Sequence, residues 1–174
     1  MPTINATPKS STANSYMTRA RCLEILGDRM NSSAYIDATQ TLQEQALIVG
    51  TWLLDAGMQW FGDRRTTDQA LGFPRTGAVN VDGWPLDYDT IPLLLERALG
   101  ELVVFLLTSD RFAEPGVLGQ GFSQASLGSI SVTVDPSQVL PYLPAHVIGM
   151  LAPLGVSNDA MARGGARVVK LARA

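Results

Sequence analysis

The chain has 174 residues, a length that suits one domain with a sizeable core. Hydrophobic residues make up 46% and charged residues only 17%, whereas charged residues average about 25% in soluble domains. Such a low charge content indicates that partners cover part of the surface. The net charge of −3 argues against a dedicated nucleic-acid binder, which would be basic.

The charge is unevenly distributed, because no acidic residue follows Asp159. Four of the 13 basic residues lie in this C-terminal segment, and the other nine share the rest of the chain with all 16 acidic residues, so the body carries about −7 and the tail +4. The segment combines basic and apolar residues behind a Gly164-Gly165 hinge: Arg163, Arg167, Val168, Val169, Lys170, Leu171 and Arg173. This pattern indicates a peptide-like arm that docks on a partner; the alternative is a disordered, solubilising tail.

The start of the chain, residues 1–14, is rich in Ser, Thr, Asn and Pro and predicts a flexible or partner-ordered arm. Thr18 is a candidate N-cap for a first helix over residues 19–30. Cys22, the only cysteine, lies in that helical pattern, which predicts a buried thiol and excludes an internal disulfide. No apolar run reaches membrane-spanning length and no signal-peptide pattern is present, so we expect synthesis in a reducing cytosol and no membrane partner.

Apolar residues at three- and four-residue spacing predict that the longest helix runs from a cap at Asp37 or Thr39 to about Phe61. Its tryptophans, Trp52 and Trp60, are two turns apart, and we expect both to lie in the core.

A third main helix is expected from a cap at Asp89 or Thr90 to Leu106, with Pro92 in its first turn. Its apolar surface is wider than one packing stripe, which predicts a central helix. Its one polar strip consists of Glu96, Arg97 and Glu101. The loop before this helix, residues 79–89, contains Trp84, which either covers the core or is an exposed contact.

Residues 110–126 contain Gly and Pro and predict a loop. Alternating apolar and polar residues then predict a half-buried strand over residues 129–135. We expect its partner to be the Val168-Val169 segment or another subunit. A short helix is expected over residues 145–152, with His146 as a packing residue.

Together these elements predict a mainly α fold, a helical bundle of three to four main helices with a short β-strand element and an extended C-terminal arm. The expected regions are a flexible N-terminal arm (1–14), a helical-bundle domain (15–112), a loop with a strand and short helix (113–162), and a basic C-terminal arm (163–174).

The decapeptide over residues 68–77 lies between the two longest predicted helices. We expect a short helical turn from Thr66, followed by an extended corner at Phe73-Pro74, because proline disfavours a helical residue before it. The segment either only ends a helix and leaves Arg75 on the surface, or it is a built corner in which Arg75 makes a fixed polar contact. The candidate site residues of the corner are Asp68, Gln69, Leu71, Phe73, Pro74 and Arg75.

This corner is one of five features that follow one another along the chain. They are an alanine- and leucine-rich helix, the exit Trp60-Phe61-Gly62-Asp63-Arg64, the corner D-Q-A-L-x-x-P-R-T-G, the helix start Ile91-Pro92, and A-x-x-E-L over residues 98–102. Over residues 15–110 the chain resembles head-to-tail connector (neck adaptor) proteins of tailed phages, in a family also called DnaT-like ssDNA-binding proteins. The usual corner carries tryptophan where this chain has Phe73, which keeps the aromatic anchor and loses the indole N–H.

The resemblance implies a structural virion protein, made in the host cytoplasm and located in the virion neck. It implies a homo-oligomeric ring of twelve copies between the portal protein and a tail or stopper protein, with DNA passing through without tight binding. The alternative is a single-stranded DNA-binding protein, which needs a basic groove and exposed aromatic side chains. The candidates around the corner are Arg64, Arg65, Arg75, Trp60, Phe73 and Trp84.

The sequence contains no pattern that indicates catalysis, metal binding or phosphate binding. A single histidine argues against histidine pairs and most metal sites, and no CxxC, HExxH or GxxxxGK[ST] pattern occurs. The glycines of residues 116–121 have no predicted strand before them and no helix after them, which argues against a phosphate-binding loop. Glu96 and Glu101 do not meet on a helix at their spacing. We therefore expect no enzyme activity, no cofactor and no metal.

Overall fold

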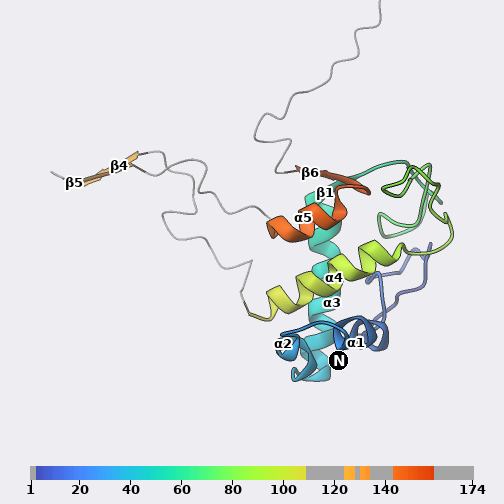
Figure 1. Cartoon of the computed structure of the whole chain (residues 1–174), viewed down its shortest axis with the longest axis horizontal. Helices are drawn as coiled ribbons and strands as arrows, with labels where there is room; N and C mark the ends of the chain where they lie inside the picture. Colours follow the sequence, from blue (N-terminus) through green and yellow to red (C-terminus); the bar gives the residue numbers. More distant parts are fainter. Residues whose placement is uncertain (1–2, 109–123, 128–129, 134–142, 159–174) are drawn as a thin grey trace, which may run out of the picture.

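The computed structural model describes residues 3–108, 124–127, 130–133 and 143–158, and in these ranges the fold is mainly α with short β elements, as predicted (Figure 1). The helices are α1 (Arg19–Gly27), α2 (Ser33–Ile36), α3 (Gln40–Gly57), α4 (Leu93–Leu106) and α5 (Ala145–Leu151). The strands are β1 (Met58–Trp60), β2 (Asp63–Arg64), β3 (Arg75–Thr76), β4 (Gln124–Leu127), β5 (Ile130–Thr133) and β6 (Gly155–Ser157).

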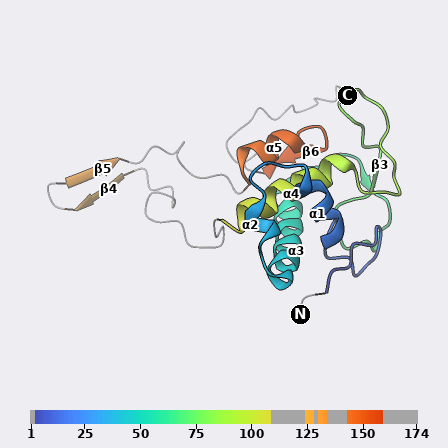
Figure 2. The same ribbon diagram turned by 60° about the horizontal axis from the view of Figure 1, so that its bottom comes forward.

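Helix α4 is the central element, as its broad apolar surface predicted. Its N-cap is Pro92, so the predicted cap at Asp89 or Thr90 was wrong; the Thr90 hydroxyl donates to Asp87 Oδ2 instead. The helix lies between α3 and α5 in both views and also contacts α1 and α2 (Figures 1 and 2). Helix α3 comes close to it at Gly50, where a Cβ atom would lie 2.8 Å from Leu99 Cδ1. The glycine therefore permits the close crossing of the two longest helices, which buries Leu95, Leu99 and Leu102.

Helix α1 begins as predicted, because the Thr18 hydroxyl accepts a hydrogen bond from the Arg21 backbone N–H at 3.2 Å. Cys22 is completely buried, as expected. The helix ends at Gly27 rather than at Met30, whose side chain is exposed. The one-turn helix α2, with Tyr35 buried, lies between the first two predicted helices, where no element was predicted.

The longest helix ends at Gly57, so its predicted end near Phe61 was wrong. The chain becomes extended because β1 pairs antiparallel with β6, with Met58 opposite Ser157 and Trp60 opposite Gly155. A Cβ atom at Gly155 would lie 2.6 Å from the Gln59 carbonyl oxygen, so only glycine fits there. Tertiary pairing with a segment distant in sequence thus overrides the helical pattern.

The predicted strand is confirmed over β5, which pairs antiparallel with β4. The expected loop over residues 110–126 was therefore wrong for residues 124–127, because these residues pair with the predicted strand. The Val168-Val169 segment lies outside the described residues. The short C-terminal helix is confirmed as α5. His146 is not a packing residue, because its side chain is 54% exposed and its Nε2 lies 4.0 Å from Glu101 Oε2.

Residues 3–14, where a flexible or partner-ordered arm was expected, form a hydrogen-bonded loop against the body. The Asn5 backbone N–H donates to Asn14 Oδ1 at 2.8 Å, and the Asn14 N–H donates back to the Asn5 carbonyl at 2.9 Å. The Ser10 carbonyl accepts from the Ala70 N–H at 3.1 Å. This last bond ties the N-terminal loop to the corner over residues 68–77.

Candidate functional site

The carboxylate of Asp55, near the end of α3, joins three separate segments. Its Oδ1 accepts hydrogen bonds from Trp60 Nε1 at 2.9 Å and from the Tyr16 hydroxyl, and its Oδ2 accepts from the Gly72 N–H at 2.9 Å. Burial, with the charge of Asp55 and the hydrogen bond to it, raises the pKa of the Tyr16 phenol well above its usual range. Tyr16 therefore stays protonated and donates. The segment before α1, the exit of α3 and the corner are thus held at one point.

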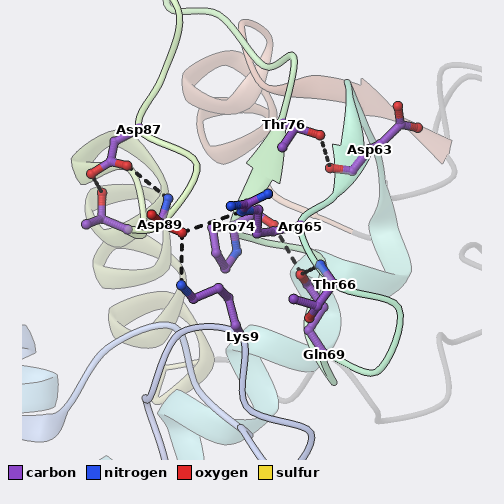
Figure 3. Close-up of polar contacts among 10 residues, drawn as sticks. Lys9, Asp63, Arg65, Thr66, Gln69, Pro74, Thr76, Asp87 and Asp89 are labelled. Atoms are coloured by element: carbon purple, nitrogen blue, oxygen red, sulfur yellow. Dashed lines mark hydrogen bonds and ion pairs between the residues drawn. The ribbon is translucent and has the colours of Figure 1, made fainter.

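Gln69 closes the corner from inside (Figure 3). Its Oε1 accepts from the Thr66 backbone N–H at 2.9 Å, and its Nε2 donates to the carbonyls of Leu71 at 2.8 Å and Pro74 at 3.1 Å. Residues 65–72 therefore form bends and not the short helical turn that the sequence indicated from Thr66. The buried side-chain amide supplies the hydrogen bonds that a helical turn would have made along the backbone.

Arg75 makes the fixed polar contact that was one of its two predicted roles. Its Nε donates to the Phe61 carbonyl at 2.8 Å, its Nη1 to the Gly72 carbonyl at 3.2 Å, and its Nη2 to the Gly62 carbonyl. The planar guanidinium thus links the exit of α3 to the corner. Partial burial, with the nearby Arg64 charge as a second cause, lowers the pKa of Arg75 from its usual value.

Phe73 is the buried anchor of the corner, with 2% of its surface exposed. Its ring meets Trp60 edge to face, with centroids 5.2 Å apart and planes at 83°. Gly72 beside it has no room for a side chain, because a Cβ atom would lie 2.6 Å from the Trp60 ring and 2.7 Å from Asp55 Oδ1. The peptide bond between Phe73 and Pro74 is cis. Leu71 is partly buried against the core, whereas Asp68 is exposed.

The residues suggested for DNA binding do not form a stacking groove. Trp60 and Phe73 are buried in the corner, and Arg75 is bound to three carbonyls. Arg64 Nη1 donates to the Gln69 carbonyl at 3.4 Å. The Arg65 guanidinium lies 4.6 Å from the Tyr88 ring centroid, and its Nε is 3.5 Å from Asp89 Oδ1 (Figure 3). Of the suggested aromatic side chains, only Trp84 remains exposed.

Residues 78–86, which we name the Trp84 hairpin, form a short antiparallel turn. The Leu86 N–H donates to the Ala78 carbonyl at 2.9 Å and the Asn80 N–H to the Trp84 carbonyl at 2.8 Å. Asn80 Oδ1 accepts from the N–H groups of Asp82 at 3.0 Å and Trp84 at 2.9 Å. Gly83 has a φ of +83°, which suits glycine. Of the two roles left open for Trp84, the structure shows the exposed one.

A second exposed apolar surface lies on α3, and we name it the α3 face. Leu42 and Trp52 are 48% and 59% exposed, and Ile48 and Val49 between them are partly buried. Residues 45–54 contain no charged side chain. The expectation that Trp52 lies in the core was therefore wrong, whereas Trp60 is buried as expected. The exposed apolar and aromatic surface resembles the composition of protein interfaces more than that of an ordinary charged surface.

The described ranges contain neither a metal-binding cluster nor a membrane-spanning helix. No group of three or more metal-ligating side chains could hold an ion there. None of the helices described has both the length and the apolar character required to span a membrane. The basic C-terminal segment, with its predicted docking residues, and the glycines of residues 116–121 lie outside these ranges.

Comparison with known proteins places the chain in one family. Residues 3–174 match the model of a family described as "Putative DnaT-like ssDNA binding protein". The match covers nearly the whole chain, so this protein belongs to that family. No curated protein and no solved structure gives a significant match.

Proposed function

We propose that this protein is a structural interaction protein, a head-to-tail connector that forms a ring between the portal and a tail or stopper protein of a tailed phage. The proposal rests mainly on the contacts that the corner residues make. The motifs that resemble connector proteins bind one another through Asp55, Gln69 and Arg75, so these side chains stabilise the fold. Such a corner suits a rigid building block without an enzymatic step.

The exposed apolar surfaces give the proposal its second support. In a ring each copy uses two different surfaces, because head-to-tail contacts are heterologous. The α3 face and the Trp84 hairpin are two exposed surfaces, and each of them exposes a tryptophan. Tryptophan is among the residues that most often dominate binding energy at interfaces. The acidic body also suits a ring through which DNA passes without tight binding. The copy number of twelve comes from the resemblance to connector proteins.

Single-stranded DNA binding is the second candidate, and the family description favours it. Exposed tryptophans such as Trp52 and Trp84 could stack on bases. Three carboxylates, however, lie in the segment from the Trp84 hairpin to the start of α4: Asp82, Asp87 and Asp89. No basic residue occurs between Arg75 and Arg97. Phosphate binding by this surface is therefore disfavoured, and we rank the connector function first.

Electron microscopy and a titration with single-stranded DNA separate these two functions. Electron microscopy of the purified protein, alone and with portal-bearing capsids, is expected to show rings that attach to the portal. Co-sedimentation of those capsids with full-length protein and with a chain ending at Ala162 tests whether the C-terminal segment contributes to attachment.

A titration with labelled single-stranded DNA is expected to show weak binding even at low salt. Tight binding that falls steeply with salt concentration, together with no rings, would favour the DNA-binding function, because phosphate contacts are strongly salt-dependent.

A further inference from the structure

We propose that the Trp84 hairpin of one copy binds the basic C-terminal segment, residues 163–174, of the neighbouring copy. This inference rests on the proposed ring and names a contact that would hold its subunits together. The surface is the exposed tip of the hairpin, and the occupant is a segment of this same chain.

The tip of the hairpin is an ordered apolar surface. Val81 and Trp84 are 75% and 71% exposed, the largest exposures among the bulky apolar residues described apart from Met30. The backbone below them is held by paired main-chain hydrogen bonds and by both bonds to Asn80 Oδ1. The hairpin therefore loses little conformational entropy when a partner buries its tip.

The charge around the tip is negative and partly uncompensated. Asp89 pairs with Lys9 at 2.9 Å and with Arg65 at 3.5 Å. Asp82 and Asp87 form no ion pair with any of the described residues. The two Asp87 oxygens accept instead from the Asp89 N–H at 2.9 Å and the Thr90 hydroxyl at 3.1 Å (Figure 3). A basic partner would supply the missing positive charge.

The C-terminal segment has the matching composition. It contains four basic residues and no acidic one, and its apolar residues Val168, Val169 and Leu171 lie between the bases. Apolar side chains could therefore cover Val81 and Trp84 while lysine and arginine side chains meet Asp82 and Asp87. Both halves of the contact, apolar and ionic, are complementary.

The path of the chain favours a neighbouring copy over the same copy. Strand β6 runs antiparallel to β1, so the chain passes from Gly155 beside Trp60 to Ser157 beside Met58. Asn158 Nδ2 then donates to the Ala56 carbonyl at 2.6 Å. The base of the hairpin lies at the other end of β1, where a Cβ atom at Gly62 would be 3.0 Å from the Ala78 nitrogen. At Asn158 the described chain therefore lies at the end of β1 that is farther from its own hairpin.

The reach of the segment is sufficient for contact between subunits. The stretch from Asn158 to Ala174 can span about 50 Å when extended. That length exceeds the diameter of a small domain, roughly 30 Å. Exchange of such segments around a ring would join each copy to the next.

Cysteine cross-linking of full-length protein tests the contact. Two variants, Val81→Cys and Leu171→Cys, are mixed at assembly concentration and oxidised, and cross-linked dimers are counted on a non-reducing gel. Cys22 does not interfere, because it is completely buried. A disulfide requires the two Cα atoms to lie within about 7 Å, so it reports close approach. The matched control uses Met30→Cys in place of Val81→Cys, because Met30 is also exposed but lies outside the hairpin.

The inference expects about tenfold more dimer from the mixture than from the control, and a decrease when Trp84→Ala is added to the Val81→Cys chain. Rings without this cross-link would overturn the inference and leave the connector function standing. A chain that carries both Val81→Cys and Leu171→Cys is oxidised in parallel. If it cross-links only within single chains, the segment binds its own hairpin, and the contact between copies is overturned. Absence of both rings and cross-links would reject the connector function and the inference together.

Discussion

Asp55 Oδ2 accepts a hydrogen bond from the Gly72 backbone N–H at 2.9 Å, although the two residues are 17 positions apart in the sequence. The same carboxylate accepts from Tyr16 and Trp60, so a single side chain determines where the corner lies against α3.

Asp55→Ala is expected to lower the free energy of unfolding by about 3 kcal/mol, because three donors lose a charged acceptor. Chemical denaturation monitored by circular dichroism measures the loss. Asp68→Ala is the matched control, since Asp68 is an exposed carboxylate of the corner, and it is expected to change stability by no more than about 0.5 kcal/mol. Equal effects of the two substitutions would contradict the central role of Asp55.

Phe73→Ala is expected to lower the free energy of unfolding by about 3–5 kcal/mol, because it removes a buried ring and leaves a cavity beside Trp60. Thermal melts compare it with Phe61→Ala, whose ring is 46% exposed and whose loss should be much smaller. An unchanged melting temperature in Phe73→Ala would show that the ring does not anchor the corner.

Arg75→Lys is expected to destabilise the protein by about 2 kcal/mol, because an ammonium group cannot reach the Phe61, Gly62 and Gly72 carbonyls together. The control is Arg97→Lys at an exposed position of α4. Thermal melts and ring assembly are measured for both. If Arg75→Lys melts and assembles like the parent protein, the planar guanidinium is not required at the corner.

The sequence predicted the features that depend on local pattern. The Thr18 cap follows from the residue type, and the central helix α4 and the short helix α5 follow from apolar spacing. Each of these is determined by residues within a few positions of one another.

The remaining features depend on contacts between segments far apart in the chain. Nothing near Gly57 indicates that β6 will pair with residues 58–60 and end α3 there. Asp55 reads as an ordinary helical acid until Tyr16 and Gly72 are brought to it. Trp52 could not be assigned to the exposed side, because helical periodicity alone did not show which α3 residues face α4.

The ion pair between Arg29 and Glu101 predicts how stability depends on pH. Arg29 Nε and Nη2 each donate to a different Glu101 oxygen at 2.8 Å, which connects the residues after α1 to α4. These bonds hold the pKa of Glu101 below its usual value, against a smaller opposing effect of burial. A carboxyl with a lowered pKa in the folded protein stabilises it above the unfolded pKa of about 4.3, and this contribution is lost as pH falls through the folded pKa.

Arg29→Gln is therefore expected to lower stability at neutral pH by up to about 1 kcal/mol, since the pair is partly exposed to solvent. The stability difference between parent and variant should shrink as the pH is lowered from about 5 to 3, because Glu101 becomes protonated in both proteins. His146, with Nε2 at 4.0 Å from Glu101 Oε2, is replaced by Gln in a second pair of proteins to remove its contact with Glu101. Denaturant midpoints at intervals of half a pH unit give the comparison. A difference that stays constant, or grows, toward acid pH would show that the pair does not act through the ionised Glu101 carboxylate.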